Sequence, residues 1–299
     1  MQPSIIWGEE FPMPDEAVFN ALIVIAVRLA PNVYRALGTG FIIGSSGHSA
    51  AAVSAAHVFD EIYKIQNPQQ PQPWKPFQHV PPQMVDLDAE SVFGIVFQNG
   101  RSHTLRLLDL MYDTVSDVAV FTITKKKVDS RPIFTTAVHL DSSMPDVGTE
   151  IEAIGFRNMD FSPKMVGQFL VTEFRAALVR RSGKITEILQ RGILLKGPGA
   201  VVSFPIFGGM SGGPVLRLGT GKAPAAFGLL TSDMDSGIDT ATEKDDRTRE
   251  GFTTVAKLPI SWDFDKTGQR VLAFKFLSND IGRSIDLVSD SSTQRTASL

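Results

Sequence analysis

Short apolar runs, rich in Val, Ile and Phe, alternate along the chain with polar segments rich in Gly, Pro, Asn, Asp and Ser. Apolar runs of this length between turn-forming residues predict β-strands, and many of them in succession predict an all-β sandwich or barrel. We expect strands at Ala21–Val27, Gly40–Ile43, Ser91–Phe97, Val118–Ile123, Glu150–Ile154, Gly192–Leu195 and Ala225–Leu230.

Helical patterns are scarce, and the best candidates are the stretch after Ala55 and a segment near the C-terminus. Asn67–Pro82 is dense in proline and glutamine and predicts a long surface loop, because proline has no N–H to donate to a strand ladder. Asp233–Glu250 is almost entirely polar and predicts a second loop, and Asp290–Leu299 predicts a frayed tail.

Composition narrows the class of protein further. The chain has 299 residues, of which 43% are hydrophobic, a formal net charge of -3 and a pI near 6.0, which disfavours a nucleic-acid partner. It has no cysteine, which excludes disulfides, thiolate metal sites and a cysteine nucleophile. The first residues lack the basic start of a signal peptide, and Ala21–Val27 is far shorter than the ~20 residues of a membrane-spanning helix. We therefore expect a soluble, cytoplasmic protein with no membrane partner.

The strongest chemical motif is the glycine-rich segment Gly208–Pro214, with Ser211 at its centre. Such a segment can be a simple hairpin. An acyl-transfer nucleophile also needs this arrangement, because its side chain must be accessible and backbone N–H groups must converge on the developing oxyanion. Glycine supplies the backbone conformations that other residues resist.

A serine nucleophile needs a base to remove its proton. All the histidines, His48, His57, His79, His103 and His139, precede Ser211. An α/β-hydrolase uses the order Ser, Asp or Glu, His, so this order excludes that fold and leaves His, Asp, Ser. His57 follows the small residues Ala50–Ala56 and is the best candidate base, although a lone histidine there can also be a core residue.

The third member of such a site orients the imidazole and stabilises its protonated form. Asp117 directly precedes the predicted strand Val118–Ile123. Asp109 and Asp113 are close competitors, but neither leads directly into a strand. An aspartate that only caps the strand is the alternative interpretation of Asp117.

Four segments together resemble the signature blocks of the trypsin-like (chymotrypsin-fold) serine peptidases, in particular the bacterial-type members, and they occur in the family's order. They are Gly38–Ile43, Ser54–Val58, Asp117–Phe121 and Gly209–Pro214. Glu150–Phe156 resembles the opening strand of the second barrel of these enzymes. The resemblance extends from about Val18 to about Pro259.

The resemblance implies an all-β fold of two antiparallel six-stranded β-barrels, with the active site in the cleft between them. The implied domains are an N-terminal extension (1–17), a first barrel (18–140), a second barrel with a C-terminal segment (141–289) and a disordered tail (290–299). His57 would act as general base and then acid, Asp117 would orient it, and Ser211 would attack the scissile carbonyl. The N–H groups of Gly209 and Ser211 would form the oxyanion hole. This chemistry needs no cofactor and no metal.

Two positions depart from the best-known members of the family. Met210 stands where zymogen-activated members have an aspartate, so we expect no activation by N-terminal trimming. Pro205 stands at the expected base of the primary specificity pocket, and Thr231 and Ser232 align with its wall. No acidic residue occurs there, so we expect a preference for apolar or small side chains over Arg or Lys.

The expected function is that of a serine endopeptidase acting on peptide or protein substrates. One alternative is a catalytically silent peptide-binding module of the same fold, or a latent form that an activating protein partner switches on. Another is an esterase, which the order of the residues disfavours in its usual fold.

Overall fold

The computed structural model describes most of the chain and leaves several segments out. The described residues are 4–7, 16–45, 48–69, 83–85, 90–98, 101–113, 115–125, 134, 136–166, 168–190, 198–218, 224–233, 252–264 and 270–274. The predicted strand Gly192–Leu195, the C-terminal helical candidate, nearly all of both predicted loops and the predicted tail 290–299 lie outside these residues.

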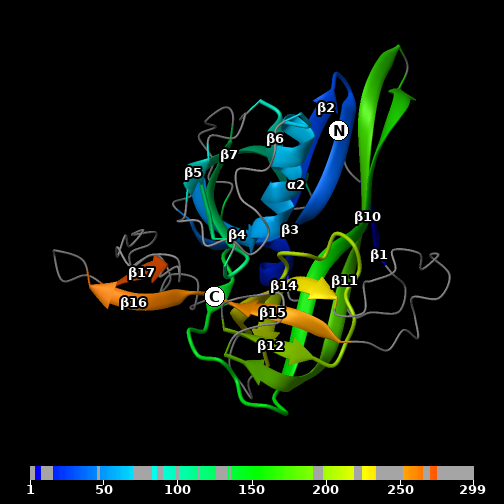
Figure 1. The fold of residues 1–299 in the computed structure, drawn as a ribbon. Coiled ribbons are helices and arrows are strands. Elements are labelled where there is room, and N and C mark those ends of the chain that lie inside the picture. The colour runs from blue at the N-terminus through cyan, green and yellow to red at the C-terminus, as the bar shows by residue number, and fades with distance from the viewer. Residues whose placement is uncertain are drawn as a thin grey trace.

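The first half of the chain forms a closed six-stranded barrel (Figure 1). Its strands pair in the order β7-β6-β2-β3-β4-β8, all antiparallel, and β8 pairs again with β7, which closes the ring. A short strand, β5 (Gln83–Val85), adds to β7. The barrel strands are β2 (Leu22–Ala30), β3 (Val33–Ser45), β4 (Ser49–Ala55), β6 (Val92–Gln98), β7 (Arg101–Asp113) and β8 (Val118–Lys125).

The second half forms another closed ring of six antiparallel strands, in the order β11-β10-β13-β14-β15-β12 and back to β11. These strands are β10 (Glu150–Val166), β11 (Phe169–Leu189), β12 (Gly199–Val202), β13 (Pro214–Arg217), β14 (Ala225–Asp233) and β15 (Thr253–Lys257). The two barrels confirm the predicted fold class.

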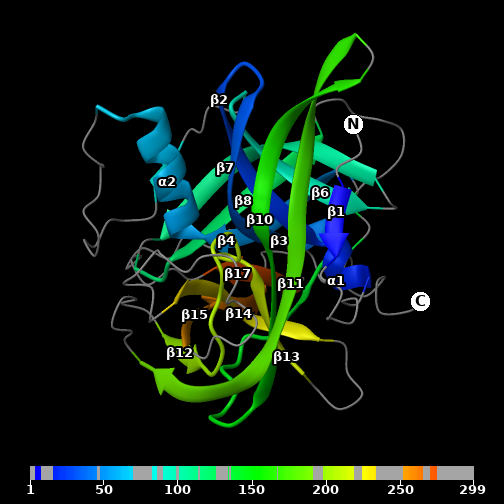
Figure 2. The ribbon, with the colours of Figure 1, turned by 90° about the vertical axis from the view of Figure 1, so that its right-hand side faces the viewer.

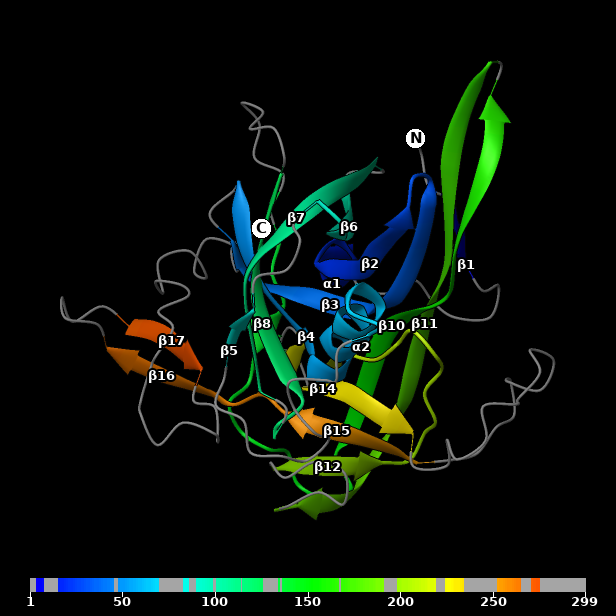
Figure 3. The same cartoon turned by 45° about the horizontal axis from the view of Figure 1, so that its top comes forward.

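Four further strands lie outside the two rings. β1 (Ser4–Trp7) runs parallel to β11, and β9 (His139–Leu140) runs parallel to β14. β16 (Ile260–Phe264) and β17 (Arg270–Phe274) form a separate two-stranded sheet. The far end of the β10–β11 hairpin projects beyond the barrels (Figure 3).

Helix α2 (Ala56–Gln66) starts directly at the end of β4 (Figure 2) and confirms the helix predicted after Ala55. Its buried residues Val58, Phe59 and Ile62 recur at helical spacing and form one apolar face. Phe59 packs edge-on against Phe121 of β8, with ring centroids 5.3 Å apart. The helix is thereby fixed to the first barrel. A shorter helix, α1 (Glu16–Asn20), precedes β2.

None of the helices in the described part of the chain is long and apolar enough to cross a membrane.

The first part of strand β10, residues 151–156, is buried on both faces. Successive side chains of a strand point to opposite sides, so these residues contact two different cores. Ile151 and Ala153 belong to the apolar core of the second barrel, whereas Ile154 and Phe156 belong to the core of the first. Phe97 of β6 packs against Phe156, at 5.7 Å between ring centroids. The apolar core of the first barrel therefore continues into the second barrel, and this shared interface sets how the barrels are placed relative to each other.

The core of the first barrel gives a stability prediction. We expect Phe121→Ala to lower the free energy of unfolding by about 3–5 kcal/mol, because it leaves a cavity beneath Phe59, and Phe121→Leu to cost only about 1 kcal/mol. The matched control is Phe252→Ala, at a side chain that is 48% exposed, for which we expect less than about 0.5 kcal/mol. Urea unfolding measures all three, and equal losses for Phe121→Ala and Phe252→Ala would contradict the described packing.

Candidate active site

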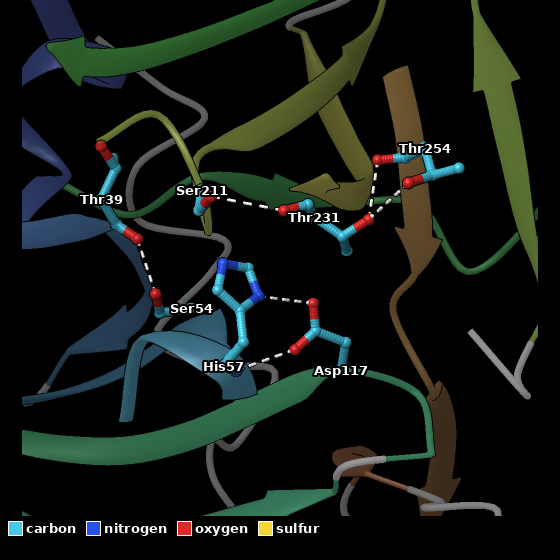
Figure 4. A network of polar contacts seen from close by, with 7 residues as sticks. All are labelled: Thr39, Ser54, His57, Asp117, Ser211, Thr231 and Thr254. Carbon is cyan, nitrogen blue, oxygen red and sulfur yellow. Dashed lines mark hydrogen bonds and ion pairs between the residues drawn. The ribbon is translucent and has the colours of Figure 1, made fainter. Parts of the chain in front are cut away.

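Asp117 contacts His57 at two points (Figure 4). Its Oδ2 lies 2.8 Å from Nδ1 of the imidazole, and its Oδ1 accepts the backbone N–H of His57 at 2.9 Å. The backbone carbonyl of Asp117 also accepts the N–H of Ala56, at 3.1 Å. The first N–H groups of a helix have no partner within the helix, and Ala55 at the N-cap has no side chain that could cap them. Asp117 therefore caps α2 and orients the imidazole at the same time.

A buried turn presents Asp117 to His57. Asp117 has a φ of 54°, in the left-handed region that costs a non-glycine residue about 1 kcal/mol or more. The carboxylate of Asp113, fully buried, accepts the N–H groups of Val115 and Ser116, at 3.0 and 3.3 Å, and the hydroxyl of Ser116 at 2.7 Å. These bonds form the turn before β8 and offset the strain in it.

Of the three candidate aspartates, Asp117 is the one that the structure brings to His57. Asp113 forms the turn, and Asp109 is exposed at an irregularity of β7, with a φ of 50°.

The electrostatics of the site favour a protonated imidazole. Burial lowers the pKa of His57, but the negative charge of Asp117 and its hydrogen bond, with smaller contributions from Asp60 and Glu61, outweigh this and raise the pKa above its usual 6.5. The His57 side chain is still 43% exposed, whereas that of Asp117 is only 12% exposed. In the neutral imidazole, Nδ1–H donates to Asp117 and Nε2 is the acceptor. Figure 4 shows this second ring nitrogen directed toward the side of Ser211.

Ser211 lies in the segment between β12 and β13, and glycines allow this segment to pack against the first barrel. Gly209 and Gly212 have φ values of 93° and 83°, which glycine adopts without strain. A Cβ on Gly212 would collide with the hydroxyl of Ser54 and with the backbone carbonyl of Thr39. Ser54 stands in β4, three residues before His57, so this close packing brings the serine segment beside the imidazole.

The Ser211 hydroxyl donates to the backbone carbonyl of Thr231, at 3.3 Å. This carbonyl is available because the pairing of β14 with β15 is irregular between Leu230 and Ser232. Among the described residues, no hydrogen bond joins Ser211 to His57. The candidate base and the candidate nucleophile thus come from different barrels, and the Ser211 hydroxyl is bonded to Thr231 and not to His57.

The predicted oxyanion-hole groups belong to this same segment. Met210 N–H donates to Phe207 O at 3.0 Å, and Gly212 N–H donates to Leu230 O at 2.8 Å. The N–H groups of Gly209 and Ser211 have no acceptor within the described part of the chain. Two free N–H groups next to a nucleophile are the groups that bind an oxyanion.

The residues predicted for the specificity pocket lie next to the core of the second barrel or in the paired strands β14 and β15. Pro205 is buried between Phe204 and Ile206, which belong to the core of the second barrel. The Thr231 hydroxyl donates to the carbonyl of Thr254 at 2.8 Å, so this side chain is directed at β15. Ser232 pairs with Thr254 in the strand register. A role of Pro205, Thr231 and Ser232 in binding substrate stays a prediction.

Met210, between the two candidate N–H donors, is fully buried in the core of the second barrel. The side chain between these two N–H groups is therefore an apolar core group and carries no charge.

The sequence interpretation did not identify Thr39 or Asp113 as parts of the site. Thr39 stands in the middle of Gly38–Gly40, one of the blocks on which the resemblance rests, and a polar residue between two glycines at the start of an apolar run was the available signal. The described residues contain no cluster of three His, Asp or Glu side chains that could hold a metal ion.

Comparisons with known proteins identify a family. The family model described as "Trypsin-like peptidase domain" matches residues 38–224. Among solved structures, the chain is similar to the inactive form of a serine-to-alanine mutant of Rv3671c from M. tuberculosis H37Rv. The identity is 12% and the TM-score 0.44, over 81% of this chain and 82% of that one. No curated protein matches the sequence significantly.

The contact between His57 and Asp117 predicts a titration result. We expect the pKa of His57, followed through its ring proton resonances in NMR, to lie above 6.5 in the native protein. Asp117→Asn should lower it by more than any other single change, because the main contribution that raises it is lost. Glu61→Gln is the matched control, with a much smaller decrease. A pKa that does not respond to Asp117→Asn would contradict the described pair.

Proposed function

Because this chain belongs to the family of trypsin-like peptidase domains, we propose that it is a serine endopeptidase in which His57, Asp117 and Ser211 form the catalytic triad. The observation that supports the proposal most directly is the bond from the imidazole Nδ1 to Asp117, which leaves Nε2 to face the side of Ser211 (Figure 4).

In the proposed reaction, Nε2 of His57 takes the proton of the Ser211 hydroxyl while Oγ attacks the carbonyl carbon of the scissile peptide bond. The negative charge of Asp117 stabilises the imidazolium that forms. The oxyanion accepts hydrogen bonds from the N–H groups of Gly209 and Ser211. The C–N bond then breaks, the leaving amine takes the proton from His57, and an acyl-enzyme remains. Water, deprotonated by His57, hydrolyses the acyl-enzyme and restores Ser211.

The bond between Ser211 and Thr231 is compatible with this reaction. At 3.3 Å it is long for an O–H···O hydrogen bond, whose usual length is about 2.7–2.8 Å. Rotating the hydroxyl away from Thr231 therefore costs little.

The same bond is the observation that favours the second candidate function. A partner-activated or catalytically silent peptide-binding module would not need a bond between Ser211 and His57, and the Ser211 hydroxyl is bonded to Thr231 instead. The bond from Asp117 Oδ2 to the imidazole supports the enzyme instead. Capping of α2 needs only Oδ1 and the backbone carbonyl of Asp117, so a module that only binds peptides has no use for the contact with Nδ1. The proposal includes a peptide or protein substrate. It also includes a cytoplasmic location, which the absence of cysteine from the sequence supports.

Labelling with a fluorophosphonate probe tests the nucleophile. We expect the native protein to be labelled, and Ser211→Ala and His57→Ala to lose labelling, because the probe reacts with a serine that a base activates. Ser143→Ala is the matched control, since this serine is exposed and its hydroxyl donates to Asp141, outside the proposed triad. Gel fluorescence and intact mass measure the labelling. Labelling that persists in Ser211→Ala would exclude the proposed nucleophile, and an unlabelled native protein would favour the binding module.

Peptide cleavage tests the specificity. Because the position expected at the base of the pocket is Pro205, next to Ile206 and with no acid, we expect peptides with apolar or small residues before the cut to be preferred over Arg and Lys peptides. A difference in kcat/KM of about 10-fold or more is expected across a matched series. A preference for Arg or Lys would show that the pocket base lies elsewhere.

A further inference from the structure

Thr39 of β3 is a fully buried polar residue at the seam between the barrels. Its hydroxyl donates to the backbone carbonyl of Gly209 at 2.8 Å and accepts the backbone N–H of Phe156 at 2.9 Å. One hydroxyl of the first barrel therefore connects the serine segment to β10.

The backbone of Thr39 makes two more bonds at the same place. Its N–H donates to the carbonyl of Ser211 at 2.9 Å, and its carbonyl accepts the hydroxyl of Ser54 at 2.6 Å. Figure 4 shows the Thr39–Ser54 pair on the same side of the imidazole as Ser211. Thr39 thus contacts the carbonyls on both sides of Met210–Ser211, the peptide whose N–H is a proposed oxyanion donor.

The planarity of the peptide bond gives these contacts a consequence. In a trans peptide the C=O and the N–H point in opposite directions, so fixing a carbonyl also fixes the next N–H. Thr39 Oγ1 fixes the peptide Gly209–Met210, and Thr39 N–H fixes the peptide Ser211–Gly212. The Met210–Ser211 peptide lies between these two fixed planes, and its own carbonyl accepts the N–H of Gly213 at 2.9 Å. Its orientation therefore depends on Gly213 as well as on the two neighbouring peptides that Thr39 holds.

We propose that Thr39 is a positioning residue for the oxyanion hole: its hydroxyl holds the Gly209–Met210 peptide so that the N–H groups of Gly209 and Ser211 stay directed at the developing oxyanion. This inference rests on the proposed peptidase function. Thr39 touches no substrate and no reacting atom, and it acts only through the serine segment.

Valine is the informative substitution because it has the shape of threonine without the hydroxyl. Thr39→Val leaves the Gly209 carbonyl and the Phe156 N–H without their buried partner, and water cannot reach a fully buried site to replace it. The Gly209–Met210 peptide is then held only by the bond from the Met210 N–H to Phe207, so its plane can shift, and the N–H groups on either side of it shift with it. The backbone bond from Thr39 to Ser211 remains.

The kinetic test compares the native protein with Thr39→Val and Thr39→Ser. For Thr39→Val we expect kcat to fall about 10- to 100-fold, less than or comparable to the loss of one oxyanion donor, with KM changed by less than about threefold. The affinity for a peptide boronic acid, whose adduct places an oxygen in the hole, should fall by a similar factor. Thr39→Ser keeps the hydroxyl and should retain kcat to within about threefold.

Thr253→Val is the matched control, since Thr253 is a fully buried threonine of β15 whose hydroxyl has no hydrogen-bond partner among the described residues. We expect it to leave kcat and boronic-acid affinity unchanged. Thr39→Ala removes the same hydroxyl together with the methyl group of threonine. It is measured in parallel in case Thr39→Val does not fold. Equal losses in Thr39→Val and Thr39→Ser, or a rise in KM at constant kcat, would overturn the inference.

Hydrogen exchange of the backbone amides supplies a readout that does not depend on activity. The amide of Met210 is bonded to Phe207 and that of Gly212 to Leu230 of β14, and we expect both to exchange faster in Thr39→Val than in the native protein or in Thr253→Val. Unchanged exchange would overturn the positioning role. Cleavage that survives in Ser211→Ala would instead refute the proposed function, whatever the exchange data show.

Discussion

The packing of β10 against the first barrel is the constraint on which the rest of the site depends. The proposed base and its aspartate belong to one barrel, and the proposed nucleophile belongs to the other. β10 has two apolar faces, with Ile151 in the core of the second barrel and Phe156 in the core of the first. Side chains in such cores are close-packed and resist displacement. The apolar packing of β10 therefore sets the distance between the proposed base and the proposed nucleophile.

Polar contacts at the seam then fix orientation within this placement. Asp117 caps α2 and binds the imidazole, so any movement of the helix start would break both bonds together. The close approach of Gly212 to Ser54 admits no side chain, and Thr39 bonds the carbonyls of Gly209 and Ser211. These groups are buried, and a buried polar group that loses its partner costs about 1–3 kcal/mol. The apolar interface holds the two barrels together but is less selective about their orientation. The buried hydrogen bonds at the seam fix this orientation, because their loss is costly.

The sequence predicted the parts of this structure that have a local signal. Short apolar runs predicted the strands. The glycines around Ser211 predicted its unusual backbone, which the φ values of Gly209 and Gly212 confirm. It favoured Asp117 over Asp113 because Asp117 directly precedes β8, but it could not predict the buried turn that the carboxylate of Asp113 forms. The bond from Ser211 to Thr231 was also beyond prediction, since it depends on an irregular pairing of two strands far apart in the sequence.

The resting position of Ser211 and the raised pKa of His57 are physically connected. A protonated imidazole has two N–H donors and no acceptor, so it cannot accept the serine hydroxyl. By raising the pKa, Asp117 keeps a larger share of His57 protonated near neutral pH, and the hydroxyl of Ser211 then has its better acceptor in the carbonyl of Thr231. Loss of the proton creates an acceptor at Nε2 that competes with Thr231. The carboxylate that makes His57 a stronger base therefore also sets the pH range in which Ser211 can bond to it, and the irregular pairing at Thr231 supplies the alternative partner in the remaining range.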